Sequence, residues 1–551
     1  MKKKNWNSTI KYIVGACLFL TSLVACGVKA GKQTEEVSLE EQTEVTVSED
    51  TVAVETVSVD TVTYVLSDEP DKKVESVSAP EINLANYNED EMAIPALYIT
   101  TANGYGIESR DMYVSGNMIY EGKQYEADFR GRGNASWTKF AQRSYMIKLA
   151  EKESLIDGAV KARRWVLISN FMDYSMMRNP VAQCIAKRLN GMEFGIGQQP
   201  VDVFINGVYE GVYILSEKIE EGKGKVNLFS NAEDYPYDPA KAVRYGDLKD
   251  PEKMAARTVE NDDVAFFFEA GYDLYESHTY GLDQFITRHS TTLILQYPEF
   301  TVANNPEALA IQNYLNEMEK AFLSKENIFD YIDKDSWVDW FITMEITNNT
   351  DSSFCRSTFF YKRPGEKVML GPVWDFDMAY GNYGLEDNSY SSWCTGEPRF
   401  VGNQNHWMTD LLACDEFMLA VRQRWDEIHE TFLDDTYSEI EMLGQEILPS
   451  RGFHQSLYGR GGWDSTESLK NFVTKRFNWI EQSIYMGNFN RKGIPYSITI
   501  ITDEEGNQQI VTVGENGTTG DTVTEENRGE NQLGDEEFLG NDVIEIEAVE
   551  E

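Results

Sequence analysis

The pattern of apolar and polar positions changes along the chain. It predicts mainly strands in the first half and mainly helices in the second half. Short or alternating apolar runs predict strands at residues 125–130, 144–149, 165–169, 201–205, 208–215 and 264–270. Apolar spacings of three and four predict helices at 176–189, 306–322 and 336–347, with two or three more between 406 and 485. The fold class is therefore α+β. A polar connector at 235–263 places a hinge near 219–270.

The second half contains a hairpin with acidic residues at both ends. Its strands at 357–362 and 368–373 are joined by a turn with a Pro-Gly pair. A hairpin brings its two ends together whatever its length. We therefore expect Asp351, which precedes the hairpin, to be a neighbour of Asp375 and Asp377, which follow it.

The spacing of Asp375 and Asp377 indicates a metal site. In a strand both side chains would face one side, with Phe376 on the other. Two oxygen ligands on one face suit Mg²⁺ or Mn²⁺ carried by a nucleotide, since such a cation usually keeps several waters. The alternative is a pair of capping or turn carboxylates, because Asp is common in loops.

A glycine loop lies between two predicted strands, and the second of these carries Lys148. The loop consists of Arg130, Gly131, Arg132, Gly133 and Asn134. Glycines let backbone N–H groups approach an anion closely, and the Arg and Lys side chains would add positive charge. The alternatives are an ordinary hairpin loop and a surface lysine whose stem covers apolar neighbours.

The order of these features is that of a protein-kinase core: glycine loop, strand lysine, helix, hairpin, polar connector, helix, loop Asp, hairpin and metal-type Asp. In detail, the chain resembles the spore coat protein H (CotH) kinases, atypical kinases of the protein-kinase-like fold. The resemblance spans roughly residues 95–385. It rests on Arg130-Gly131-Arg132-Gly133-Asn134, Arg143-Ser144-Tyr145, Ile147-Lys148-Leu149, Asp173, Arg178-Asn179, Pro200-Val201-Asp202-Val203, Asn206-Gly207-Val208-Tyr209-Glu210-Gly211, and Gly371 to Asp377 with Gly381.

This resemblance implies an atypical two-lobed kinase-like fold, with ATP and Mg²⁺ or Mn²⁺ as cofactors and the Ser, Thr or Tyr hydroxyl of a protein as phosphoacceptor. It implies that Asp351 is the catalytic residue, which orients or deprotonates the acceptor hydroxyl, and that Asp375 or Asp377 holds the metal. The glycine loop and Lys148 would hold the phosphates. Glu217 and Lys218 would lie where a kinase hinge meets adenine.

One position departs from the kinase pattern. A conventional kinase has an Asn five positions after its catalytic Asp to hold a second metal, and Arg356 stands there. An Arg side chain cannot ligate a cation, although it would neutralise a phosphate. The position also supports an alternative function, a surface or spore-coat binding protein on the same fold without turnover. A third alternative is a glycoside hydrolase that uses two carboxylates beside Trp374, Trp393 and Trp407.

The N-terminal residues indicate export. Residues 1–26 contain an early group of lysines, an apolar run at 12–20 and the ending Leu23-Val24-Ala25-Cys26. This ending resembles a bacterial lipobox, which implies that Cys26 becomes the lipidated first residue. We therefore expect an extracytoplasmic protein anchored to the membrane by lipid. A plain signal peptide and an uncleaved anchor are the alternatives.

Composition defines the remaining segments. Acidic residues number 92 and basic residues 49, a net charge of −43, which argues against nucleic acid as a partner. Residues 27–92 read as a disordered acidic linker, 93–495 as the kinase-like domain, and 496–551 as an acidic tail with a small hairpin at 498–501 and 510–513. Four further cysteines match no zinc pattern and permit disulfides: Cys184, Cys355, Cys394 and Cys414. Nothing in the sequence indicates an oligomeric state.

Overall fold

The computed structural model describes residues 87–228, 261–271, 278–288, 291–300, 302–354, 356–382, 390–395, 407–458 and 466–486, and the backbone of 497–502 and 508–513. The predicted signal peptide and most of the predicted linker, polar connector and tail lie outside these ranges. The described part contains both helices and strands, which confirms the α+β class. Within it, no helix has the length and apolar character needed to cross a membrane.

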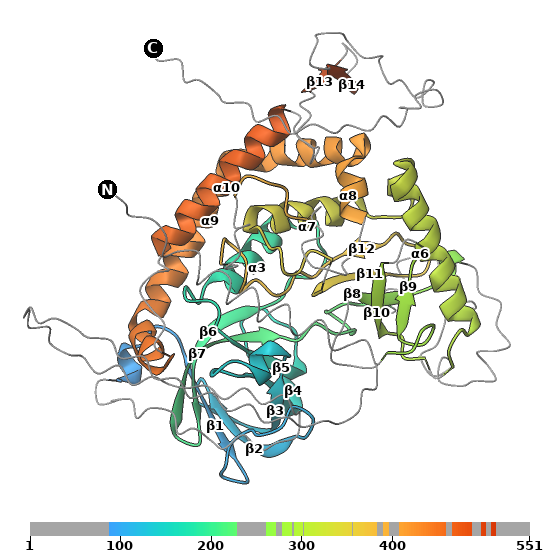
Figure 1. The fold of residues 1–551 in the computed structure, drawn as a ribbon. Helices are drawn as coiled ribbons and strands as arrows, with labels where there is room; N and C mark the ends of the chain where they lie inside the picture. The colour runs from blue at the N-terminus through green and yellow to red at the C-terminus, as the bar shows by residue number, and fades with distance from the viewer. Residues whose placement is uncertain are drawn as a thin grey trace, which may run out of the picture. The chain divides into compact units, whose positions relative to one another are not determined.

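Seven strands form a closed barrel in the order β1-β2-β3-β4-β5-β7-β6 (Figure 1). They are β1 (Ala96–Thr101), β2 (Val114–Tyr120), β3 (Lys123–Arg132), β4 (Ser144–Glu153), β5 (Ala162–Ser169), β6 (Gln198–Ile205) and β7 (Val208–Glu217). Parallel pairing of β1 with β6 closes the barrel, and the other pairs are antiparallel. Alternate residues such as Phe129, Ile147 and Trp165 fill its interior. Asn206 and Gly207, between β6 and β7, both have positive φ, as a type I′ turn requires.

A second sheet of five strands lies between two apolar clusters. Its order is β12-β11-β8-β10-β9. The strands are β8 (Phe266–Ala270), β9 (Gln284–Ile286), β10 (Thr292–Tyr297), β11 (Thr358–Lys362) and β12 (Met369–Leu370). Phe266 and Phe268 belong to one cluster and Phe267 to another, so β8 is buried on both faces. This double burial explains why its sequence is a continuous apolar run rather than an alternating one.

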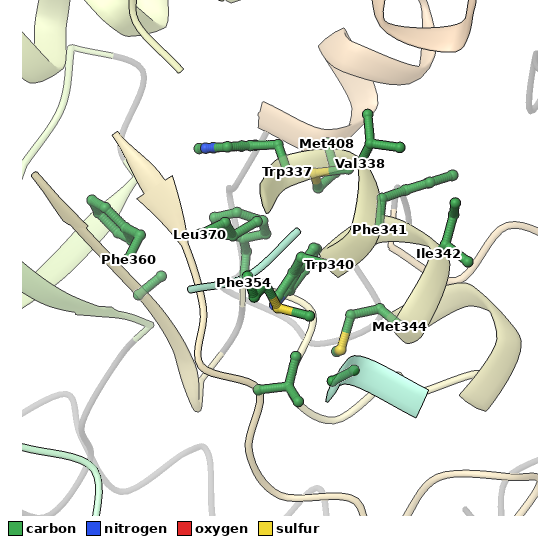
Figure 2. Packing of buried hydrophobic residues seen from close by; sticks show 14 of the residues in the cluster. Trp337, Val338, Trp340, Phe341, Ile342, Met344, Phe354, Phe360, Leu370 and Met408 are labelled. Atoms are coloured by element: carbon green, nitrogen blue, oxygen red, sulfur yellow. The ribbon is translucent and has the colours of Figure 1, made fainter. Parts of the chain in front are cut away.

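Helices supply most of the largest apolar core. They are α3 (Arg178–Leu189), α6 (Pro306–Ser324), α7 (Lys334–Thr347), α8 (Trp407–Leu412), α9 (Asp415–Tyr458) and α10 (Thr466–Met486), with the short α2 (Ala135–Thr138) beside the barrel. Every residue of α7 from Ser336 to Thr347 is buried. Trp337, Trp340 and Phe354 pack together beside Phe360 of β11 and Leu370 of β12 (Figure 2).

The C-terminal end of α9 forms hydrogen bonds with the barrel strands β6 and β7 and so connects the barrel with the helical region. Ser450 donates to the buried Asp202 of β6 at 2.5 Å, and the Tyr458 hydroxyl donates to the Glu210 carbonyl at 2.8 Å. The N–H of Val212 donates to His454 Nδ1 at 3.1 Å, and burial lowers the pKa of His454 to about 3. Asp202, which belongs to the family-like sequence 200–203, therefore has a packing role between β6 and α9.

Several details differ from the sequence predictions. Strands β1, β2, β9 and β10 were not predicted; β2 contains Gly116 and Asn117, which weaken a strand pattern. The strand predicted at 368–373 is only two residues long. Cys184 and Cys414 are free thiols, and Cys355 lies outside the described residues. The predicted tail hairpin is confirmed as β13 (Ser497–Thr502) and β14 (Gln508–Val513).

Candidate functional site

The end of α7 positions Asp351. The helix stops at Thr347 because Asn348 adopts a left-handed conformation with φ of +49°, and the N–H of Asn349 bonds back to the Met344 carbonyl at 3.1 Å. The chain then leaves the helix in a loop, as predicted, and the side chain of Asp351 is 16% exposed. A fully packed helix thus fixes the start of the loop that carries the predicted catalytic carboxylate.

The segment that carries Asp375 and Asp377 is not a strand, so the predicted alternation of their side chains is wrong. β12 ends at Leu370, and Asp375 has φ of +70°. This left-handed conformation is uncommon for a residue other than glycine and marks local strain. The chain therefore turns at Asp375 instead of running straight through the two carboxylates.

Helix α3 holds this turned segment in place. Arg178 Nε donates to the Ala379 carbonyl at 3.1 Å, Asn179 Oδ1 accepts from the Phe376 N–H at 2.9 Å, and Gln183 Nε2 donates to the Val373 carbonyl at 2.9 Å. Asp173 in turn pairs with Arg178 at 2.5 Å, where both side chains are buried. The residues Asp173 and Arg178-Asn179, to which sequence reasoning gave no role, hold the acidic segment by its backbone.

The three predicted carboxylates come together. Burial raises the pKa of Asp351 to about 6; the cation of Arg356 opposes this rise and the charge of Asp375 adds to it. Burial also raises the pKa of Asp377 well above its usual range, with contributions from Asp375, Asp351 and Asp173. Carboxylates that disfavour each other's ionisation in a poorly solvated place form a site suited to a cation.

Sequence reasoning missed two side chains beside Asp375. Ser357 Oγ donates to Asp375 Oδ2 at 3.1 Å, and the Ser357 N–H donates to Glu269 Oε1 at 3.2 Å. Glu269 belongs to the apolar strand β8, and an acid within such a run was the available signal. Both Asp375 and Glu269 act electrostatically on Arg132, whose guanidinium lies 5.1 Å from the Trp374 ring centre.

A mainly basic face of the barrel, which also carries Asp128 opposite Lys148, approaches the site through Arg132. In the register of β3, β4 and β5, Arg130 and Arg132 share their face with Lys148 and Arg164. Lys148 is exposed, and its Nζ lies 5.4 Å from the Tyr113 ring centre. Its row is four residues from that of Arg132, or about 13 Å along the strand. Arg132 is therefore the cation of this face whose charge acts on Asp375.

The glycine loop is built differently from a simple phosphate cradle. Gly131 is the penultimate residue of β3, and its N–H already donates to the Ser109 carbonyl at 2.7 Å, so it is not free to bind an anion as predicted. A Cβ on Gly131 would lie 2.4 Å from the Trp137 ring. The Trp137 ring of α2 therefore leaves no room for a side chain at position 131, which explains the glycine there. Arg110 Nη1 donates to Asn134 Oδ1 at 3.1 Å, and Gly133 has φ of +90°.

Glu217 and Lys218 lie at a cleft between the end of β7 and the segment before Asp375. The cleft is lined by Phe194, Ile196, Lys218, Ile219, Lys225 and Pro372, with Glu217 among its walls. Glu217 accepts from the Gly197 N–H at 2.8 Å, so its carboxylate is used in the fold. Burial lowers the pKa of Lys218 to about 8, opposed by Glu220 and reinforced by the cations Arg164 and Arg132. Glu220 also lines the cleft and pairs with Lys225 at 2.7 Å. The cleft therefore combines apolar walls with two lysines and two carboxylates.

The structure also bears on the predictions made for Arg356 and for the three tryptophans. Arg356 is half-exposed, with Nε 3.9 Å from Asp351 Oδ1. Trp374, Trp393 and Trp407 are 7%, 4% and 0% exposed, so they are core residues and do not form a sugar-binding surface. The hydrolase alternative loses its aromatic platform.

The residues at the site fit a cation that brings much of its own coordination. Within the described ranges, no three His, Cys, Asp or Glu side chains form a metal-holding group. Mg²⁺ and Mn²⁺ bound with a nucleotide need only one or two carboxylates, because phosphates and waters complete the sphere. Asn349 Oδ1, buried beside Asp375, has no hydrogen-bond partner among the described residues and is a further oxygen that a cation would satisfy.

Comparison with known proteins gives one positive result. The family model described as CotH kinase protein matches residues 129–480, from within β3 to within α10. The match includes the acidic cluster and α3, together with the barrel strands from β4 onward. A search of curated proteins finds no match.

Proposed function

Because this chain belongs to the CotH kinase protein family, we propose that it is a phosphotransferase that moves the γ-phosphoryl group of ATP to a protein Ser, Thr or Tyr hydroxyl. The observation that carries the proposal is that the charges of Asp351, Asp375 and Asp377 act on one another, while Arg132 is within electrostatic reach of Asp375. Phosphoryl transfer needs a proton acceptor, a place for a metal and positive charge for phosphates. The site offers all three, from the loop after α7, the strained segment that carries Asp375 and Asp377, and the end of β3.

The roles follow from the environment of each side chain. Asp351, on the loop after α7, would orient the acceptor hydroxyl and take its proton. Asp377 and Asp375 would hold Mg²⁺ or Mn²⁺, and the cation would supply positive charge that stabilises the transferred phosphoryl group. Arg132 would pair with phosphate oxygens on the opposite side. Ser357, by donating to Asp375, orients that carboxylate.

We place the adenine in the cleft beside Lys218. Its walls are apolar on the side of Phe194 and Ile196, which suits a flat base, and Pro372 connects it to the acidic segment three residues later. The barrel and the helical region would then act as the two lobes of an atypical kinase. Lys148, on the same barrel face as Arg132, would meet the phosphates only if they extend along that face.

The alternative of a binding protein without turnover has one specific observation in its favour. Arg356 occupies the position of the second metal-binding Asn, and its charge acts on Asp351. A permanent cation beside the catalytic carboxylate weakens it as a proton acceptor. In this alternative the chain binds a nucleotide and transfers nothing.

Thermal stability and label transfer distinguish the two functions. At a nucleotide concentration 100 times Kd, binding adds about 2.7 kcal/mol, which for a domain of this size raises Tm by about 3 °C. A kinase shows this rise with MnATP and also transfers label from γ-labelled ATP to itself or to an added protein. A rise without transfer supports the binding protein. No rise and no transfer would refute both.

For location, we propose that the mature protein is anchored outside the cytoplasm by a lipid on Cys26. The support is the lysine-rich start, the apolar run and the lipobox-like ending of residues 1–26. Labelling of the protein with a fatty-acid analogue, lost in a Cys26→Ala variant, tests the anchor. Labelling that persists in the variant would contradict it.

A further inference from the structure

Two buried carboxamides hold consecutive residues of the acidic segment. Asn349, which is fully buried, donates Nδ2 to the Asp375 carbonyl at 2.9 Å. Asn179, 1% exposed, accepts at Oδ1 from the N–H of Phe376 at 2.9 Å. These bonds fix the orientation of both amides, because a carbonyl oxygen cannot donate and an N–H cannot accept. The remaining ends are Asn349 Oδ1, an acceptor, and Asn179 Nδ2, a donor.

Within the part of the chain that the structure describes, neither remaining end has a hydrogen-bond partner. A buried polar atom without a partner costs free energy, and native structures resolve nearly all such cases with protein, water or ligand. The two atoms differ in what would satisfy them. Asn349 Oδ1 accepts a cation or a donor, whereas Asn179 Nδ2 cannot ligate a cation.

Two observations and one general rule connect Asn349 Oδ1 with a metal. The residue is two positions before Asp351, and its Nδ2 donates to the backbone carbonyl of Asp375, so it is linked to two acidic members of the site. The described carboxylates, thiols and imidazoles make no three-membered metal group, so a cation here needs another protein oxygen or additional waters. Carboxamide oxygens are ordinary ligands of hard cations.

On the basis of the proposed function, we propose that Asn349 Oδ1 ligates the nucleotide-bound cation and replaces the carboxamide that Arg356 displaced. In a conventional kinase that carboxamide follows the catalytic Asp by five positions. Here it would precede Asp351 by two, from the end of α7. Its own N–H bond to Asp375 would hold the oxygen in place before the cation binds.

Gln183 provides a matched control. Its Nε2 donates to the Val373 carbonyl at 2.9 Å and its Oε1 is also without a described partner, so it makes the same kind of bond to the same segment. Val373, however, belongs to the apolar core. Gln183→Leu therefore removes a carboxamide that anchors the segment outside the carboxylate cluster.

The experiment measures Mn²⁺ binding to the full chain by the loss of the free-Mn²⁺ signal in electron paramagnetic resonance, with a non-hydrolysable ATP analogue present. Asn349→Leu should weaken Mn²⁺ binding about tenfold or more, because even indirect partners of a metal contribute that much. Gln183→Leu should change it by about twofold at most. Asn349→Asp, which keeps an oxygen but loses the donor to Asp375, should bind Mn²⁺ at least as tightly as the wild type.

The following results would contradict the proposal or the proposed function. Equal weakening by Asn349→Leu, Asn349→Asp and Gln183→Leu would mean that Asn349 only positions the segment, which overturns the proposal. Unchanged binding in Asn349→Leu would overturn it too. If Asn349→Leu does not fold, Asn349→Asp and Gln183→Leu still distinguish ligand from anchor. Absence of Mn²⁺-nucleotide binding in the wild type would instead refute the proposed function.

Discussion

Replacing Arg178 with methionine should destabilise the fold by about 3–5 kcal/mol. Arg178 and Asp173 form an ion pair at 2.5 Å with side chains 5% and 0% exposed. At an effective dielectric constant of 20, their attraction is about 7 kcal/mol, and the desolvation of each ion costs several kcal/mol in return. The intact pair therefore contributes little, but removal of one partner leaves the other buried and uncompensated. Methionine keeps most of the apolar stem, so the change reports mainly on charge.

The double variant Asp173→Asn with Arg178→Met separates charge from packing. Because neither ion is left alone, it should be less destabilised than the sum of the single variants by more than about 1 kcal/mol. Urea denaturation of the four proteins gives the free energies of unfolding that the cycle needs. A loss below about 1 kcal/mol in Arg178→Met, or strict additivity in the double variant, would refute the reasoning.

The remaining predictions concern packing and pH. Gly131→Ala should cost about 1–3 kcal/mol, measured as a fall in Tm, because the new methyl group would lie 2.4 Å from the Trp137 ring. Asp351 has a folded pKa of about 6 against a usual value of 3.8, so stability should fall by about 2 kcal/mol as pH rises from 4 to 6 in metal-free buffer. Asp351→Asn should make that slope clearly shallower, with the rest coming from Asp377, whose pKa is also raised; an unchanged slope would contradict the assignment. His454 has a pKa lowered to about 3, so the stability it contributes above pH 6.5 should be lost as pH falls to 3, and His454→Gln should make unfolding less acid-sensitive.

Sequence reasoning identified the elements that carry the site but not the conformation within them. The hairpin argument placed Asp351 near Asp375 and Asp377 correctly, since it depends only on chain connectivity. The prediction that the side chains of Asp375 and Asp377 share one face was wrong, because Asp375 has a positive φ where an extended strand was expected. That turn is imposed by hydrogen bonds from α3, about 200 positions earlier in the chain, and no local pattern reports such contacts.

The closing of the barrel also could not be predicted from local sequence patterns. The pairing of β1 with β6 depends on residues more than 100 positions apart, such as Leu97 and Val203. For Gly131, the sequence showed that a glycine is needed but not why. The reason is the close Trp137 ring rather than a bound anion. Asn349 is two positions before Asp351 in the sequence, yet only its hydrogen bond to the Asp375 carbonyl in the folded chain distinguishes it from Asn348, which caps α7.

The most direct test of the central claim is label transfer from γ-labelled ATP with Mn²⁺ by the wild type, Asp351→Asn and Asp377→Asn, with nucleotide binding measured in parallel. The account predicts transfer by the wild type. Asp351→Asn should bind the nucleotide normally and lose transfer by at least about a hundredfold, the scale of a general base. Asp377→Asn should lose Mn²⁺ binding and transfer together. Transfer that survives in Asp351→Asn, or a wild type that binds MnATP and transfers nothing, would contradict the account.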